Sequence, residues 1–371
     1  MSISKLKYKL KNLQIICNYL EVFMDYSSEI SIIKKLIRKT ELKQNDFVLL
    51  LVNTSYEKNI NLTSNSVLEQ LSVSDLSSAN LLEIETSFRL SSKYYRFYHS
   101  SAEFLGSLLL GELDSNKKLL LYSTTHLDSS ATGRSIIPLI ATKKNIISLT
   151  SSPYSLAITK NKFDYFKLLD GIVPIPRTIF LEEDIMSIDS YPVIVKPTLE
   201  CCAKNVNLIH DKDSLIKQYK IINSELKQPV IVQEYVEGLE INVPILRYDN
   251  NKYLPLPPTI IVPNSNSQIL TEDIIKNGEY HYILPNSEEY PLNYETIRQL
   301  QDYSQKIATR LDLGGLSRID FKLNKRDNIP YVFDIASIPY LTKYDACYQS
   351  VHSLFPDDSE ALYKMIIGSA L

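Results

Sequence analysis

The fold is decided by two stretches near the C-terminal end of the chain, Ser317-Arg318-Ile319-Asp320-Phe321 and Tyr331-Val332-Phe333-Asp334-Ile335-Ala336-Ser337-Ile338-Pro339. Apolar and polar residues alternate in each stretch, as they do in a strand with one buried face. The polar segment between them, Asn324-Lys325-Arg326-Asp327-Asn328, predicts a hairpin turn. Pairing the two strands would bring the carboxylates of Asp320 and Asp334 onto one surface, next to Arg318.

These three side chains are suited to phosphoryl chemistry. Mg2+ prefers oxygen ligands and is usually shared between one or two carboxylates and the phosphates of a substrate. A guanidinium group beside such an ion can hold a second anion. The competing interpretation is a solvated hairpin whose acids only face water. The sequence therefore predicts Asp320 and Asp334 as metal ligands, with surface charge as the alternative.

Length and composition indicate a globular protein of two or three domains. The chain has 371 residues, of which 44% are hydrophobic and 22% are charged. A formal net charge of −3 provides no general attraction to nucleic acid or to an anionic membrane, so neither is expected as a partner. The four cysteines have neither metal-ligand spacing nor a disulfide framework, and no signal peptide or transmembrane span is recognisable. A reducing compartment, the cytoplasm, is the predicted location.

The first half of the chain has the pattern of an α/β protein with a mainly parallel sheet. The continuous apolar run at 47–52 is typical of a strand covered on both faces, 118–122 is a second candidate for such a strand, and a further strand is predicted at 145–149. Helices are predicted from Ser64 and over 133–141. Ligands bind beyond the carboxyl ends of such strands, where Glu57 and His126 lie. Further along, the pattern predicts helices over 155–169, 213–227 and 293–313, the last ending at Gly314, and strands over 192–197, 229–234 and 240–245.

From about Phe47 to Ser350 the motifs resemble those of the ATP-grasp ligases, and among them the D-alanine–D-alanine ligase type. The similar segments are, in chain order, 53–62, 125–133, Asn161-Lys162, 193–197, 232–240, 318–320 and 334–339. The resemblance implies an ATP-grasp fold, α+β in its nucleotide-binding half, with an N-terminal parallel-sheet pre-ATP-grasp domain. It implies a helical, lysine-rich extension at 1–44, the N-terminal α/β domain at 45–152, a central small lobe at 153–236 and a C-terminal catalytic lobe at 237–371. The extension is expected to serve packing or partner contact ahead of membrane-surface binding.

The resemblance also implies ATP and Mg2+ as cofactors and a role for individual residues. Asp320 and Asp334 would hold Mg2+, and Arg318 would stabilise the oxyanion of the reaction. Contacts to ATP would come from Lys162, Lys196, Gln233, Glu234, Val236, Glu240 and Lys276. Glu57 would anchor a substrate ammonium and His126 would orient the carboxylate side, with a plain turn acid and a core histidine as the open alternatives.

The chain also departs from the family pattern at several positions. The phosphate loop, Thr198-Leu199-Glu200-Cys201-Cys202-Ala203-Lys204-Asn205, contains no glycine. Lys204 either compensates for this with its charge or is simply solvated. Ala336 replaces the metal-binding asparagine, Tyr340 replaces a glycine, and Ala131 replaces an acid.

Because the chain has most of the family motifs but departs from several of them, two functions are predicted. The first is an ATP-dependent ligase that joins an amino-acid or peptide carboxylate to an amine through an acyl phosphate, specialised and distinct from the enzyme of the cell-wall dipeptide. The second is a catalytically impaired ATP-grasp protein that acts as a nucleotide-binding or partner subunit. Small amino acids or peptides are the expected substrates, and a homodimer is expected only because relatives often pair.

Overall fold

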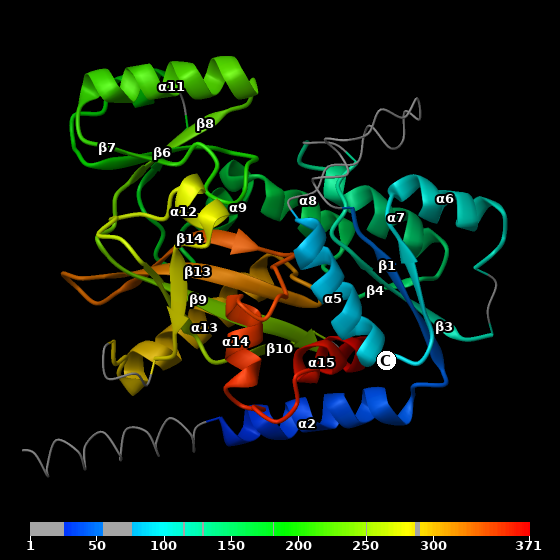
Figure 1. Cartoon of the computed structure of the whole chain (residues 1–371). Helices are drawn as coiled ribbons and strands as arrows, with labels where there is room; N and C mark the ends of the chain where they lie inside the picture. Colours follow the sequence, from blue (N-terminus) through cyan, green and yellow to red (C-terminus); the bar gives the residue numbers. More distant parts are fainter. Residues whose placement is uncertain are drawn as a thin grey trace, which may run out of the picture.

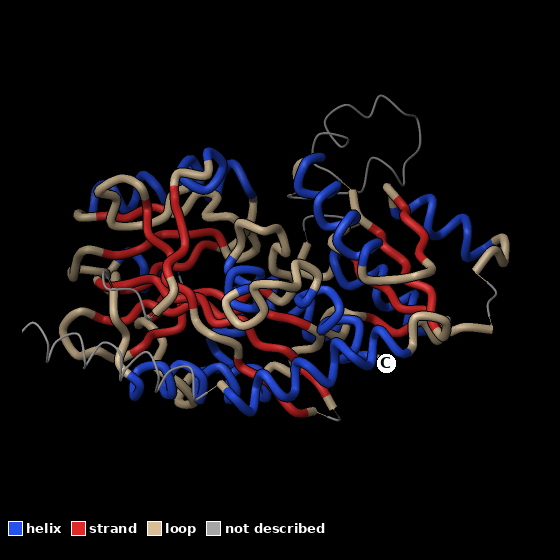
Figure 2. Tube along the Cα trace, turned by 60° about the horizontal axis from the view of Figure 1, so that its bottom comes forward, coloured by secondary structure: helices blue, strands red, loops and turns tan. Residues whose placement is uncertain are grey.

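The computed structural model describes residues 26–54, 76–113, 116–127, 130–180, 182–249, 251–285 and 290–371. Within these ranges the strands form three sheets (Figure 1). One sheet belongs to the N-terminal half, and the other two lie together on the opposite side of the molecule (Figure 2). None of the helices in these ranges is long and apolar enough to cross a membrane.

The N-terminal sheet has the order β2-β1-β3-β4, and its neighbouring strands pair in parallel. Its strands are β1 (Phe47–Val52), β2 (Tyr95–Tyr98), β3 (Lys118–Ser123) and β4 (Ile147–Ser148). Its flanking helices are α5 (Ser78–Leu90), α6 (Ser101–Leu109) and α7 (Ile136–Lys143), the last preceded by the 3-10 turn η1 (Gly133–Ser135). The predicted parallel α/β architecture is therefore confirmed. Sequence analysis missed β2, because its first two residues are exposed and it has no continuous apolar run.

Strand β1 is buried on both faces because successive residues enter two different cores. Phe47, Leu49 and Leu51 pack in a core shared with α5, while Leu50 and Val52 pack with residues of α6 and α7. This arrangement accounts for the unbroken apolar run in the sequence.

Helix α2 (Ser27–Leu42) joins the N-terminal sheet to the end of the chain. It runs beside α15 (Ala361–Ala370), as Figure 1 shows. Ile33, Leu36 and Ile37 of α2 enter the same core as Phe47 and the apolar residues of α15. The described part of the predicted extension thus serves packing.

The two remaining sheets form the other half of the molecule, for which the resemblance implies an α+β fold. The larger has the order β12-β11-β9-β13-β14, with β10 also paired to β9, and the smaller has the order β5-β8-β6-β7; every pair is antiparallel. The larger sheet consists of β9 (Gly238–Tyr248), β10 (Lys252–Pro255), β11 (Thr259–Pro263), β12 (Tyr280–Ile283), β13 (Leu316–Asn324) and β14 (Pro330–Ala336). The smaller consists of β5 (Thr178–Ile179), β6 (Val193–Pro197), β7 (Asn207–Ile209) and β8 (Val230–Glu234).

Helices cover one face of each of these two sheets. Helix α11 (Lys212–Leu226) packs on the smaller sheet through Leu215, Tyr219 and Ile222. Helix α13 (Tyr294–Arg310) packs on the larger sheet, where Leu300 and Ile307 share a core with alternate residues of β9 and β13. Because side chains alternate along a strand, the polar residues between these apolar ones lie on the other face of the larger sheet. Shorter helices α10 (Glu182–Met186), α12 (Glu272–Asn277) and α14 (Ala346–His352) complete the described part.

The predicted hairpin is confirmed, and two predicted helices are wrong in their extent. Strands β13 and β14 pair with Asp320 opposite Asp334. The expected helix over 155–169 is two helices, α8 (Pro153–Lys160) and α9 (Lys162–Leu169), because Asn161 between them is extended and its side chain accepts a hydrogen bond from the Phe163 amide. Helix α13 ends at Arg310 and not at Gly314, since the chain turns through a left-handed residue at Asp312.

Substitution of Gly368 by alanine should loosen α15 from α2. A Cβ atom at Gly368 would lie 2.1 Å from the Leu36 carbonyl oxygen, so the two helices would have to separate. We expect a loss of about 1–3 kcal/mol in the free energy of unfolding, measured by urea unfolding followed by circular dichroism. Gly106→Ala is the matched control, because nothing lies within 4 Å of its Cβ position in α6 and alanine favours a helix. Equal urea midpoints for the two variants would contradict this account.

Candidate functional site

A single cavity collects most of the residues that the sequence singled out. Its walls come from β6 and the loop that follows it, from the segment that joins β8 to β9, from β13 and β14, and from the N-terminal half of the chain. The predicted residues that line it are His126, Lys162, Lys196, Gln233, Glu234, Val236, Glu240, Arg318, Asp320 and Asp334.

Asp320 is held by a guanidinium and an amide from the same face of the larger sheet. Arg318 donates from Nε to Oδ1 at 2.7 Å and from Nη2 to Oδ2 at 2.8 Å. Asn242 on β9, which lies opposite Asp320 in the β9–β13 register, donates from Nδ2 to Oδ1 at 2.8 Å. Burial raises the pKa of Asp320 above its ordinary value, and Arg318 opposes this rise. Arg318 retains one guanidinium nitrogen, Nη1, that has no hydrogen-bond partner in the described part of the chain.

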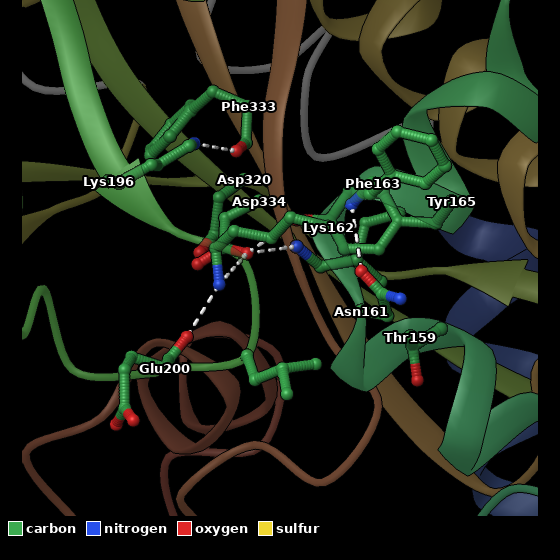
Figure 3. Close-up of polar contacts among 12 residues, drawn as sticks. Thr159, Asn161, Lys162, Phe163, Tyr165, Lys196, Glu200, Asp320, Phe333 and Asp334 are labelled. Carbon is green, nitrogen blue, oxygen red and sulfur yellow. Dashed lines mark hydrogen bonds and ion pairs between the residues drawn. The ribbon is translucent and has the colours of Figure 1, made fainter. Parts of the chain in front are cut away.

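Asp334 has a different set of partners, all from helix α9 and its own backbone. Tyr165 donates its hydroxyl to Oδ1 at 2.9 Å, and Lys162 Nζ lies 3.7 Å from the same oxygen (Figure 3). Although burial alone would raise the pKa of Asp334, Lys162, Lys196 and the Tyr165 hydroxyl lower it to about 2. Its side chain is 35% exposed, so it is a charged carboxylate that the cavity can reach.

Lys196 extends from β6 to the hairpin strand β14. Its Nζ donates to the Phe333 carbonyl oxygen at 3.0 Å and lies 5.4 Å from the centre of the Phe166 ring (Figure 3). Burial lowers the pKa of Lys196 to about 7, while Asp334 acts in the opposite direction. At neutral pH, small changes in the surroundings of Lys196 therefore decide whether its amine is charged.

The loop after β6 is tied to the cavity through Glu200. Lys162 Nζ donates to the Glu200 carbonyl oxygen at 2.6 Å (Figure 3). The Glu200 carboxylate pairs with Lys204 at 3.3 Å. Gln228 donates to the other Glu200 oxygen at 2.8 Å. Lys204 is thus an ion-pair partner at the rim of the cavity.

The same loop adopts a backbone shape that usually calls for glycine. Cys202, Ala203 and Asn205 have φ angles of 53°, 52° and 55°, all in the left-handed region. Each such residue costs about 1 kcal/mol when it carries a Cβ atom. Cys202 Sγ lies 3.1 Å from the Tyr340 hydroxyl, which connects the loop to the segment after β14. A shape of this kind is found where backbone amides approach an anion closely.

Three of the residues expected to contact ATP come from β8, from the segment after it and from β9. Gln233 turns its side chain away to Thr178 on β5, at 2.8 Å, while Val236 is buried at the cavity wall. Glu240 pairs with Lys322, opposite it on β13, at 3.1 Å.

The structure does not bring every predicted residue to the cavity. Glu57 falls outside the described residues. Lys276 is 67% exposed, pairs with Glu272 at 2.5 Å on α12 and does not line the cavity, so the structure gives its predicted phosphate contact no support. His126 lines the cavity at the end of the N-terminal sheet, and its role remains a prediction.

The side chains fit a magnesium ion with one condition. Asp320 and Asp334 stand opposite each other on paired strands, and oxygen ligands of this kind suit Mg2+. Asn242 is 2% exposed and its Oδ1 is a buried acceptor without a partner in the described part of the chain. Arg318 already bonds both oxygens of Asp320, so a magnesium ion there would have to compete with Arg318 for the carboxylate. Ala336 adds no ligand, and no group of three or more His, Cys, Asp or Glu side chains that could hold a metal occurs in the ranges that the structure covers.

Sequence analysis missed several cavity residues that simple spacing could have indicated. Asn242 lies two positions after Glu240 on a strand and therefore on the same face. Tyr165 lies three positions after Lys162 on a helix and therefore beside it. Lys160 and Arg134 also line the cavity and are buried, but no pattern in their neighbourhood distinguishes them from core or surface residues.

Residues 176–354 match the family model described as D-ala D-ala ligase C-terminus. The D-alanine–D-alanine ligase of Petrotoga mobilis is 27% identical over 228 residues, which cover 60% of this chain and 71% of that protein. The ligase of Acetivibrio thermocellus is 27% identical over 183 residues, which cover 48% of this chain and 46% of that protein. The alignment thus spans about half the length of the Acetivibrio relative.

Two solved structures share the fold. The D-alanine–D-alanine ligase of Bacillus anthracis, complexed with ATP, has a TM-score of 0.61 and 17% identity, over 88% of this chain and 97% of that one. The VanG D-Ala:D-Ser ligase of Enterococcus faecalis has a TM-score of 0.63 and 12% identity, over 88% of this chain and all of that one.

Lys196 should titrate far below an ordinary lysine, and Asp334 should control the midpoint. In NMR titrations of 13C-labelled lysine side chains we expect Lys196 to change charge near pH 7, against about 10.4 for an ordinary lysine. Asp334→Asn should lower the midpoint further, because the carboxylate favours the ammonium form. Asp302→Asn, which removes an exposed partner of Lys306, should leave it unchanged. An ordinary midpoint for Lys196 would refute the burial argument.

Proposed function

The chain is an ATP-grasp, D-alanine–D-alanine ligase-like protein, and from this premise we propose that it is an ATP-dependent ligase that joins the carboxylate of an amino acid or peptide to an amine. The observation that carries the proposal is the convergence of two lysines, two aspartates and an arginine in one cavity. They are Lys162, Lys196, Asp320, Asp334 and Arg318. Such a set is what transfer of a phosphoryl group requires, since that reaction depends mainly on positioning and on neutralising charge.

The reaction has two steps. A carboxylate oxygen attacks the terminal phosphorus of ATP, so that an acyl phosphate forms and ADP leaves. The amine then attacks the acyl carbon, the new C–N bond forms, the bond to the phosphate oxygen breaks, and the amine loses a proton. Mg2+, held by Asp320 and Asp334, would supply charge neutralisation at the phosphates.

Each cationic residue has a distinct task in this scheme. Lys162 is anchored to Glu200 and Asp334, which fixes its ammonium between the loop and the hairpin. Lys196 approaches from the opposite sheet and would gain its full charge when phosphates arrive. Arg318 has Nη1 available, which can donate to the oxyanion that develops at the acyl carbon.

A specialised substrate is more consistent with this cavity than the cell-wall dipeptide. Tyr340 and Ala336 line the cavity at positions where the family carries glycine and asparagine. The bulk of Tyr340 and its contact with Cys202 reduce the room beside the loop. Small amino acids or peptides remain the proposed substrates, and homodimerisation remains a proposal that rests on the relatives alone. Within the described ranges, Cys201, Cys202 and Cys347 form no disulfide, which suits the proposed cytoplasmic location.

A second function is favoured by one contact. Arg318 occupies both carboxylate oxygens of Asp320, so the acid already has a counter-ion. If nucleotide does not displace this contact, the protein binds nucleotide without catalysis, as a sensor or partner subunit. The two functions differ in whether nucleotide is turned over.

Purified protein incubated with ATP, Mg2+ and a pooled set of amino acids should release ADP in an amino-acid-dependent manner. Arg318→Ala should lower this release by about 10²–10³-fold, because an oxyanion donor is lost, and Asp334→Asn should reduce it to background. Arg326→Ala in the exposed hairpin turn is the control and should retain full activity. If the wild-type protein binds nucleotide but releases no ADP with any of the pooled amino acids, the result would count against the ligase and in favour of the second function.

Nucleotide binding should be coupled to protonation of Lys196. At pH 8 the lysine is mostly neutral in the free protein, since its pKa is about 7, and bound phosphates favour the ammonium form. We expect an uptake of up to about one proton per nucleotide, measured by calorimetry of ADP binding in two buffers of different ionisation enthalpy. Lys196→Met should abolish the uptake and weaken binding, whereas Lys196→Arg should abolish the uptake and keep a charge. Unchanged uptake in both variants would exclude Lys196 as its source.

A further inference from the structure

The cavity contains a buried acid that the proposed reaction does not use. Asp345, the residue that precedes α14, lines the cavity on the side of Arg318 and is 6% exposed. It lies outside the pair of acids assigned to magnesium, and its side chain does not cap the helix that it precedes.

The Asp345 carboxylate is fixed in place through one of its oxygens. Oδ2 accepts hydrogen bonds from the backbone amide of Thr342, at 3.0 Å, and from the Thr342 hydroxyl. Oδ1 accepts no hydrogen bond from any residue in the described ranges. Asp345 therefore offers a rigidly placed oxygen that lacks a donor.

The nearest cation does not satisfy this oxygen. Arg318 is within electrostatic range of Asp345, but its Nε and Nη2 are committed to Asp320. Burial raises the pKa of Asp345, and the Thr342 hydrogen bonds and Arg318 only oppose that rise. Burying a charged carboxylate without a cationic partner costs free energy, and a cation bound beside Asp345 would supply that partner.

The walls around Asp345 suit such a cation. Tyr280 and Tyr282 on β12 line the same cavity, with ring centres 5.8 Å apart in an edge-to-face arrangement. Neither hydroxyl has a hydrogen-bond partner in the part of the chain that the structure covers. Burial raises the pKa of both phenols, Arg318 lowers it, and the charge of Asp345 raises it, so both the acid and the guanidinium are within electrostatic range of the rings. Tyrosine rings beside a carboxylate attract ammonium and guanidinium groups.

We propose that this end of the cavity binds a cationic group of the amine substrate, so that the acceptor is a diamine or a diamino acid. One amine attacks the acyl phosphate while the other rests against Asp345 between the tyrosines. The proposal rests on the ligase function, and it adds that a carboxylate on the acceptor is disfavoured at this position.

The first experiment compares two acceptors of equal length, 1,4-diaminobutane and 4-aminobutanoate, which differ in having an ammonium or a carboxylate at the far end. Binding of each to the wild-type protein, with a non-hydrolysable ATP analogue and Mg2+ present, is measured by calorimetry. We expect the diamine to bind at least about tenfold more tightly, as one charge-assisted hydrogen bond provides. Equal affinities, tighter binding of the carboxylate compound, or binding of neither compound at millimolar concentration would overturn the proposal.

The second experiment assigns the preference to Asp345. Asp345→Asn keeps an oxygen for Thr342 and removes the charge, so it should weaken diamine binding by about tenfold and leave the affinity for the ATP analogue unchanged. Asp302→Asn on the exposed face of α13 is the matched control and should alter neither affinity. If Asp345→Asn proves unstable in thermal melting, Tyr282→Leu replaces it, with the same expected selective loss. A diamine affinity unchanged in the variant used would refute the assignment.

These measurements distinguish the cationic subsite from the ligase function. Selective diamine binding without any ADP release would retain the cationic subsite and remove the ligase function. ADP release that is stimulated by 4-aminobutanoate as well as by the diamine would retain the ligase and remove the subsite.

Discussion

The site depends on the register of three neighbouring strands. Because β13 pairs with β14 on one side and with β9 on the other, Asn242, Asp320 and Asp334 stand in one row across the larger sheet. A shift of a single residue in either pairing would turn one member of the row to the opposite face, where α13 packs. The apolar core beneath the sheet therefore fixes the polar row above it, and the chemistry of the cavity is a consequence of how the other face is buried.

That dependence explains which parts of the molecule could be predicted from the sequence. Alternation in the hairpin predicted that Asp320 and Asp334 share one surface, and apolar runs located β1 and β3, since each pattern directly reflects burial. Contacts between distant segments leave no such pattern. Local spacing in the sequence therefore did not indicate three features. They are the hydrogen bond of Asn242 to Asp320, the break between two helices at Asn161, and the ion pair of Lys276 with Glu272.

The loop after β6 has a backbone shape that usually calls for glycine, although it contains none. The backbone is left-handed at Cys202, Ala203 and Asn205, all of which carry a Cβ atom. The strain is maintained by the surrounding bonds, among them those of Glu200 to Gln228 and of Cys202 to Tyr340. Tyr340, itself a departure from the family pattern, thus supports the altered loop.

The union of α2 with α15 has a consequence for the synthesis of the chain. Both helices complete the core on which β1 and α5 pack, so the N-terminal sheet remains open along one face until residues 361–370 have left the ribosome. The first half of the protein therefore reaches its final packing after the second half has been translated. During that interval the apolar residues of this core lack their final neighbours, and exposed apolar surface of this kind makes a partly synthesised chain prone to aggregation.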